Sequence, residues 1–297
     1  IERFVPNTSM RTAHATLSVG GKGLDAALVL QTLGAPLKAL SFMAGKNGEI
    51  LSSLLEKNHI DFDLIWLPGE TREANVIVET DFNRHSHITT YGYKVTREDC
   101  DRLLRRIEHY APQAEWAVMA GSLPEGAPSS FYCEIIEVLH RHGVKTLIDN
   151  QGSPLIESLS ALPDIVKMNQ HEFQETFNQP VENQEQLIQA CQSQMERYHM
   201  KSLVITRGKD GVLIFTPEGI LQGRCAVEVK EINAAGAGDA VSAALAYRLS
   251  LGDSWSQALS WAVATSVAVI KTEGTAECYL SDIMEIYPNT WVKVLKD

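Results

Sequence analysis

The turn Gly236-Ala237-Gly238-Asp239 constrains this chain more than any other segment. An apolar segment at 224–230 is expected to enter the turn as a strand, and an alanine-rich helical segment follows it. Small residues let a ligand approach the backbone closely, and the unpaired amides at a helix N-terminus attract anions. A carboxylate at Asp239 either caps this helix or takes a proton from a hydroxyl group that attacks phosphorus.

A second glycine turn, Gly20-Gly21-Lys22-Gly23, favours phosphoryl transfer. Asp25 and an apolar helix that ends at Gly34 follow this turn. Together the two turns resemble the two signatures of the PfkB carbohydrate kinases, a family with the ribokinase-like fold. These signatures are GGKGxN near the N-terminus and (D/V)xxGAGD about four-fifths along the chain. The resemblance covers nearly the whole chain.

Segments between the two turns resemble one branch of that family, the 1-phosphofructokinase and tagatose-6-phosphate kinase branch. Residues 120–126 are similar to its SGSLPxG segment, 149–155 to DxSGxxL, and 71–76 to TRxNV. Residues 163–173 resemble PxxIKPNxxEL and supply the NxxE element as Asn169 and Glu172. Residues 206–211 resemble the (S/T)xGxxG turn at the nucleotide base.

Short apolar segments alternate with helical patterns along the chain. This alternation predicts an α/β fold with a mostly parallel central sheet between two helical layers, as in the ribokinase-like three-layer sandwich. The strand candidates are 38–43, 114–120, 145–149, 164–167 and 202–206, and the helix candidates include 48–58, 97–110, 129–142, 184–198 and 255–271. We expect a single kinase domain over 1–297, with binding sites at the carboxyl ends of the strands.

Residues 72–93 alternate apolar and polar side chains, which predicts a hairpin, and 1–19 has a similar extended pattern. In the resembled family these positions form a small β-sheet lid over the sugar that often pairs with a second subunit. We therefore expect a lid at about 1–19 and 72–93, a core at 20–71 and 94–297, and a homodimer through the lid. A hairpin without function is the alternative. Glu2 aligns with the family's substrate-binding Asp, and a strand is expected before it.

Charge and composition exclude several classes of function. A net charge of −11 argues against nucleic acid as a partner, and the longest apolar run, 258–270, is too short to span a bilayer. Five scattered cysteines without a CxxC pair predict reduced thiols and a cytoplasmic protein. The chain has neither a Walker A sequence nor a histidine pair with metal-binding spacing. A kinase with this sequence is therefore not of the P-loop type.

The resemblance implies a role for each residue of the motifs. Asp239 would be the base, and the Gly236, Ala237 and Gly238 turn would hold the γ-phosphoryl group of ATP. The acceptor would contact Gly21, Lys22, Gly23, Asp25, Arg72 and Glu2, the nucleotide Asn169, Thr206, Gly208 and Gly211, and Mg²⁺ Glu172 and Asn169 through water. A helix cap explains Asn169 and Glu172 equally well, and a plain hairpin turn explains Gly208 and Gly211. We expect the helix N-terminus to keep Asp239 ionised at neutral pH.

Two departures from the family pattern concern the acceptor. Asp25 replaces the usual Asn, and an ionised Asp25 only accepts hydrogen bonds and repels a phosphate. Residues 89–93 replace the branch's NExGP. Lys22 and Arg72 instead favour a phosphorylated acceptor, because two cations beside a neutral sugar would be poorly compensated.

The leading hypothesis is an ATP- and Mg²⁺-dependent kinase of a hexose phosphate. Fructose 1-phosphate, fructose 6-phosphate and tagatose 6-phosphate are the first acceptors to test. One alternative is a kinase of an unphosphorylated sugar or nucleoside, and another is a sugar-sensing binding protein without turnover. A Rossmann dehydrogenase is the weakest candidate because the 236–241 turn lacks a third glycine and lies far from the N-terminus.

Overall fold

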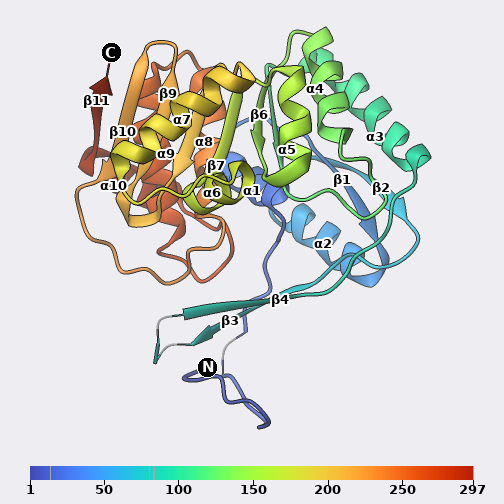
Figure 1. The fold of residues 1–297 in the computed structure, drawn as a ribbon. Coiled ribbons are helices and arrows are strands. Elements are labelled where there is room, and N and C mark those ends of the chain that lie inside the picture. The colour runs from blue at the N-terminus through green and yellow to red at the C-terminus, as the bar shows by residue number, and fades with distance from the viewer. Residues whose placement is uncertain (14, 80, 83, 297) are drawn as a thin grey trace.

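The computed structural model describes residues 1–13, 15–79, 81–82 and 84–296. Its body contains a seven-stranded sheet in the order β11-β10-β9-β8-β7-β6-β5 (Figure 1). The parallel half consists of β5 (Trp116–Ala120), β6 (Lys145–Asp149), β7 (Ile165–Asn169) and β8 (Leu203–Thr206). The antiparallel half consists of β9 (Val212–Thr216), β10 (Gly219–Cys225) and β11 (Thr290–Lys296). The four strands of the parallel half match predicted strands.

The central strands send alternate side chains into two apolar layers. In β6, Leu147 and Ile148 belong to different core clusters, and in β7 the same holds for Ile165 and Val166. One helical layer contains α3 (Arg97–Tyr110), α4 (Phe131–Arg141), α5 (Gly152–Ser158), α6 (Gln170–Phe177) and α7 (Gln184–Tyr198). The other contains α1 (Lys22–Thr32), α8 (Ala237–Ser250), α9 (Trp255–Val269) and α10 (Leu280–Ile286). The predicted three-layer α/β sandwich is confirmed.

A second, smaller sheet lies beside the parallel half. It contains β1 (Ala39–Ala44) and β2 (Phe62–Leu67), which pair in parallel and are joined by α2 (Gly45–Lys57). The strand at 38–43 was predicted, whereas β2 was not. Short 3₁₀ turns at 111–113, 159–161, 208–210 and 287–289 complete the body.

A two-stranded ribbon projects from the body (Figure 1). Strands β3 (Ala74–Glu79) and β4 (Arg84–Thr89) pair antiparallel, which confirms the predicted hairpin; its positions 80 and 83, like position 14, lie outside the described residues. The first residues of the chain run along this ribbon without forming a strand. The amino group of Ile1 donates to the Val78 carbonyl at 3.1 Å, and the Asp81 N–H donates to the Glu2 carbonyl at 3.1 Å. Glu2 therefore lies on the ribbon.

The segment that enters the Gly236 turn is not the predicted strand at 224–230. Strand β10 ends at Cys225, and no strand is assigned at 226–235. The last residue of β10 pairs with Thr290, the first residue of β11, so no neighbouring strand continues beyond this point. Val227 is exposed there. The prediction was wrong because apolar alternation alone cannot show where the pairing partner ends.

Two further findings bear on the bulk predictions. Among the helices of the described residues, none combines the length with the apolar composition that a membrane-spanning helix requires. All five cysteines are free thiols, and Cys100, Cys191 and Cys278 among them are buried. Burial raises the pKa of each of these three thiols, which keeps them protonated.

Candidate active site at the carboxyl edge of the sheet

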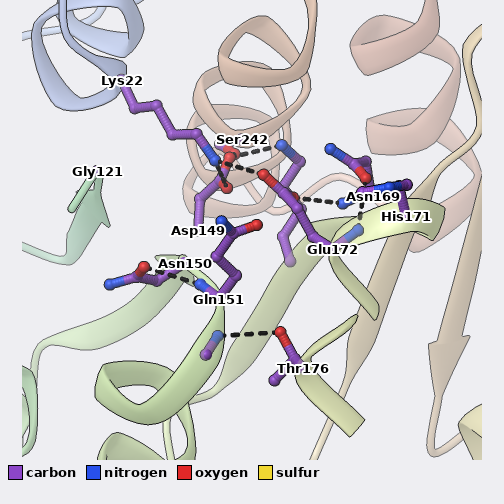
Figure 2. A network of polar contacts seen from close by, with 12 residues as sticks. Lys22, Gly121, Asp149, Asn150, Gln151, Asn169, His171, Glu172, Thr176 and Ser242 are labelled. Carbon is purple, nitrogen blue, oxygen red and sulfur yellow. Dashed lines mark hydrogen bonds and ion pairs between the residues drawn. The ribbon is translucent and has the colours of Figure 1, made fainter. Parts of the chain in front are cut away.

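A buried cluster of charges lies where β6 and β7 end (Figure 2). Asp149, the last residue of β6, is fully buried and accepts hydrogen bonds from Lys22 Nζ at 3.1 Å and Lys167 Nζ at 2.5 Å. The Ser242 hydroxyl of α8 donates to the same carboxylate at 3.2 Å. Burial alone would raise the pKa of Asp149, but the charges of Lys167 and Lys22 outweigh it and hold the pKa below its usual value. Asp149 is therefore an ionised, well-paired carboxylate.

Glu172 joins this cluster from the first turn of α6. One of its carboxylate oxygens accepts the Asn169 N–H at 2.8 Å, while the Asn169 side chain accepts the Glu172 N–H at 2.8 Å. This is a capping box. The other oxygen of Glu172 accepts from Lys22 Nζ at 3.0 Å. The helix-cap interpretation is therefore correct, and Glu172 also pairs with Lys22. We call Lys22, Asp149, Lys167 and Glu172 the paired cluster.

Lys22 begins α1 and is held by carboxylates on two other elements. Burial by itself lowers the pKa of Lys22, but the charges of Asp149 and Glu172 outweigh it and raise the pKa above its ordinary value. Its ammonium group is therefore charged at any physiological pH. The sequence predicted Lys22 on the acceptor side, and the structure places its ammonium group between the ends of β6 and α6.

The glycine turn at 236–239 forms the N-terminus of α8, as predicted. Gly236 is its cap residue with a φ of 85°, and a Cβ atom there would lie 2.5 Å from the Cβ of Ala276. A side chain at this position is excluded both by conformation and by space. A Cβ at Gly238 would lie 3.0 Å from Lys167 Nζ, so the lysine ammonium group lies against the turn. The helix amides and a buried cation thus meet at one point, which suits a bound anion.

Asp239 lies in the first turn of α8 and is 7 % exposed. Burial raises its pKa to about 7; Lys167 and Lys22 oppose this shift, and Asp149 and Glu172 add to it. The expectation that the helix N-terminus keeps Asp239 fully ionised at neutral pH was wrong. Desolvation in this packed site outweighs the stabilisation that the helix N-terminus gives to a carboxylate in its first turn.

Asp25 lies in the first turn of α1 and is 4 % exposed. Its Oδ1 atom is one of the few buried side-chain polar atoms without a hydrogen-bond partner in the described residues. Burial, and then the charge of Asp239, raise its pKa to about 8. From the sequence, Asp25 was expected to be an ionised carboxylate that would repel a phosphate. This assumption was wrong because it ignored the desolvation of the site.

Arg72 lies at the base of the ribbon and reaches the body. Its guanidinium donates to the Ser122 hydroxyl at 3.0 Å, which joins two segments that resemble the sugar-phosphate branch. Tyr132 on α4 lies nearby and donates to the Gly121 carbonyl at 2.7 Å. Burial and the charge of Asp149 raise the pKa of Tyr132, whereas Lys22 and Arg72 act against that shift. Tyr132 is thus within electrostatic reach of both Arg72 and the paired cluster.

The predicted nucleotide turn lies at the same edge of the sheet. Thr206 ends β8 and is the register partner of Asn169 at the end of β7. Gly208 opens a 3₁₀ turn, and the Gly211 N–H donates to its carbonyl at 3.0 Å. The turn joins β8 to antiparallel β9, so it is also a hairpin connection.

The structure brings most of the predicted site residues to one edge, with one exception. Glu2 lies on the ribbon, which projects from the body (Figure 1), because its backbone carbonyl accepts from the Asp81 N–H at the end of the hairpin. Sequence reasoning missed four residues that the structure places at the site: Tyr132, Asp149, Lys167 and Ser242. One signal was available, because a lysine inside an apolar strand such as 165–169 is rarely buried without a partner.

The oxygen atoms of this site do not form a metal cage. No group of three or more His, Cys, Asp or Glu side chains that could hold a metal ion occurs among the described residues. Asp149 is occupied by two ammonium groups. This donor set fits Mg²⁺ only in its usual protein mode, in which few carboxylates, several waters and substrate phosphates complete the coordination.

Comparisons with known proteins agree with the motifs. The family model described as pfkB family carbohydrate kinase matches residues 1–282. The chain is 26 % identical to the 1-phosphofructokinase of Haemophilus influenzae, covering 88 % of this chain and 83 % of that protein. It is 26 % identical to the D-tagatose-1-phosphate kinase of Bacillus licheniformis, covering 93 % and 89 %.

A solved structure supports the fold. The possible 1-phosphofructokinase of Thermotoga maritima superimposes with a TM-score of 0.90, at 23 % identity and with 100 % of this chain and 95 % of that chain covered. At this level of identity the similarity establishes the fold alone.

Proposed function

Because the chain belongs to the pfkB family of carbohydrate kinases, we propose that it transfers the γ-phosphoryl group of ATP to a hydroxyl group of a sugar phosphate. One observation carries the choice of a phosphorylated acceptor. Arg72 donates to the neutral hydroxyl of Ser122 and has no carboxylate partner among the described residues. A cation without a carboxylate partner favours a dianionic group on the acceptor.

Asp239 acts as the base in this proposal. It takes the proton of the acceptor hydroxyl while that oxygen forms a bond to the γ-phosphorus and the bond from the γ-phosphorus to the ADP oxygen breaks. The α8 amides and Lys167, whose ammonium group lies against Gly238, stabilise the charge on the group in transfer. A pKa of about 7 suits a base that works at neutral pH.

The donor side of the site would hold ATP with Mg²⁺. Glu172 and Asn169 would hold the metal through water, and the bound ion would neutralise charge on the β- and γ-phosphates. Thr206, Gly208 and Gly211 would line the adenosine site, because their turn follows β8 next to Asn169. The same turn serves as a hairpin connection, so its role toward ATP rests on the family resemblance.

A coupled ADP-release screen tests the proposed function. Acceptors would include fructose 1-phosphate, fructose 6-phosphate and tagatose 6-phosphate, their unphosphorylated sugars and a nucleoside; the Bacillus licheniformis relative adds tagatose 1-phosphate. We expect the highest kcat/KM with a sugar phosphate, and ADP release that is slower by about a hundredfold or more in the Asp239→Asn variant under the same conditions. A higher kcat/KM with an unphosphorylated sugar would contradict the phosphorylated acceptor. Absence of acceptor-dependent ADP release throughout would contradict the kinase activity itself.

The ribbon and the N-terminal segment form the proposed lid, which would cover the acceptor and pair with a second subunit. Several of their apolar side chains are exposed: Leu17 by 70 %, Ile88 by 55 % and Phe82 by 49 %. Exposed β edges with apolar side chains are usually covered by a partner. Sedimentation at micromolar concentration should show a homodimer, and Ile88→Glu should shift it to monomer. A wild-type monomer under these conditions would contradict the proposal.

We place the enzyme in a reducing compartment, the cytoplasm. Its five cysteines are free thiols, and thiols are kept reduced in the cytoplasm, where structural disulfides are rare. Fractionation of the source cells followed by the ADP-release assay would test this location.

A further inference from the structure

Asp25 and Asp239 occupy equivalent places on two packed helices. Each lies in the first turn of its helix, α1 or α8, and the neighbouring Ala26 and Ala240 belong to the same core cluster. Both carboxyl groups are more than nine-tenths removed from solvent. Two buried carboxyl groups within electrostatic reach cannot both ionise easily, so one proton tends to remain on the pair.

The surroundings determine which member of the pair keeps the proton. Lys167 and Lys22 favour the ionised form of Asp239. The main influences on Asp25 are burial and the Asp239 charge, opposed by the Gly21 backbone. An ionised Asp25 would also leave the buried Oδ1 atom charged and without a hydrogen bond, which is costly. The proton therefore belongs to Asp25, and Asp239 is left to act as the base.

A neutral carboxyl group can both donate and accept a hydrogen bond, as can the asparagine that usually stands at this position of the motif, although it has one donor hydrogen where the amide has two. One of its oxygens carries a donor hydrogen and the other accepts, whereas an ionised carboxylate only accepts. We propose that Asp25 binds the acceptor as a neutral carboxyl group, donating a hydrogen bond to a sugar oxygen and accepting one from a sugar hydroxyl. This role rests on the proposed function, because it concerns the acceptor of that reaction.

The proposal gives the site a specific dependence on pH. The main elements packed against α1 are α8, β5 and β1. Asp239 is the titratable group of α8 that acts on Asp25, Lys22 stands on α1 itself, and β5 and β1 carry no titratable residue. Loss of the Asp25 proton would remove the donor and place a second negative charge beside Asp239. Acceptor affinity should then fall at alkaline pH, while an Asn at position 25 would not respond.

Calorimetric titration of the acceptor, from about pH 6 to about pH 10, tests this role without requiring turnover. The probe is the sugar phosphate preferred in the ADP-release screen, or fructose 1-phosphate if none is turned over. We expect the wild-type Kd to rise up to about tenfold per pH unit above about pH 8. Asp25→Ala should raise the Kd at neutral pH by about tenfold or more, because hydroxyl groups lose their partner. Asp25→Asn should restore most of that affinity and should lack the alkaline rise.

An alkaline rise of equal size in Asp25→Asn would overturn the proposal, as would weaker binding by Asp25→Asn than by Asp25→Ala. Difference infrared spectra of wild type and Asp25→Asn give a second, activity-independent readout. A protonated-carboxyl band assigned to Asp25 should be present near neutral pH and lost at about pH 10, and its absence near neutral pH would also overturn the proposal. Failure of the kinase screen alone would contradict the proposed function and would leave these two readouts intact.

Discussion

Two sets of buried carboxyl groups lie at the same edge of the sheet, and their electrostatic environments are opposite. Asp149 in the paired cluster is held by two ammonium groups and a hydroxyl, and its pKa is lowered. Asp25 and Asp239, on the first turns of α1 and α8, form no ion pair in the described residues, and their pKa values are raised to about 8 and about 7. The difference follows from the position of the ammonium groups of Lys22 and Lys167, which donate hydrogen bonds to Asp149 but form no ion pair with Asp25 or Asp239 in the described residues.

This contrast indicates that the two sets of carboxyl groups have different roles in the site. A carboxylate with a lowered pKa and full pairing holds its charge at every physiological pH, so it can position cations but exchanges no proton. A carboxyl group whose pKa lies near neutrality can exchange a proton during turnover. The paired cluster therefore orders the site, and the Asp25–Asp239 pair is available for the reaction and for acceptor binding.

The largest expected effect comes from removing the base. Asp239→Asn should lower kcat by about two to four orders of magnitude, the usual value of a positioned general base. The Kd values for ATP and for the sugar should change little, because the amide keeps the size of the side chain. Rapid-quench kinetics at saturating ATP and sugar phosphate would measure the rate of the phosphoryl-transfer step. A rate close to that of the wild type would show that the unpaired carboxyl is not the base.

Breaking the paired cluster should instead reduce stability. Lys167→Met leaves the buried Asp149 with one cation fewer, and loss of a partner from a buried ion pair typically costs about 3–5 kcal/mol. Lys201→Met is the matched control, because Lys201 pairs with Asp164 at 2.8 Å but is half exposed, which predicts less than about 1 kcal/mol. Urea unfolding measures both. Equal losses of unfolding free energy in the two variants would contradict the distinction between the paired cluster and a surface ion pair.

The acceptor side offers a smaller effect. Arg72→Ala should raise KM for the sugar phosphate by a factor corresponding to roughly 1.5–3 kcal/mol, because a charge-assisted contact is lost. KM for ATP should stay nearly constant. Arg105→Ala, which removes an exposed arginine of α3 outside the site, should change neither constant. An unchanged KM for the sugar in Arg72→Ala would mean that Arg72 does not contact the acceptor phosphate.

A further prediction concerns the dependence of stability on pH. The pKa of Asp25 is about 8 in the folded protein and about 3.8 when unfolded, so between these values the folded state holds a proton that the unfolded chain releases. The contribution of Asp25 to the free energy of unfolding therefore falls as pH rises from about 4 to about 8. Asp25→Asn should gain stability relative to wild type over this interval, by more than about 1.4 kcal/mol, the equivalent of one pKa unit. Thermal unfolding that shows a constant difference across the interval would contradict the shift.

The sequence predicted the elements whose signals are local. Parallel strands with continuous apolar runs, such as 145–149, and helices with a clear period, such as 97–110, were found. Strands β2, β9 and β11 were not identified as strands. A strand was predicted at 224–230, but β10 ends at Cys225. It ends there because Cys225 pairs with Thr290, the first residue of its partner strand β11.

The site was predicted from its glycine turns and its motif residues, but its ion pairs were not predicted. Asp149 and Lys167 are register partners on neighbouring strands, a relation that depends on how β6 and β7 align. The sequence did not show this alignment, so the ion pair was missed. The protonation of Asp25 and Asp239 was misjudged for a similar reason, because desolvation arises only when α1 packs against α8.

The most direct test of this account is the pH dependence of kcat for the wild-type enzyme at saturating ATP and sugar phosphate. Asp239 must be ionised to accept the proton, and burial raises its pKa to about 7. We expect kcat to fall about tenfold for each unit of pH below that value and to level off above it. A kcat that stays constant from about pH 5 to about pH 8 would contradict the role of Asp239 as a buried base without an ion-pair partner. It would also contradict the distinction between the paired cluster, which orders the site, and the Asp25–Asp239 pair, which serves the reaction and acceptor binding.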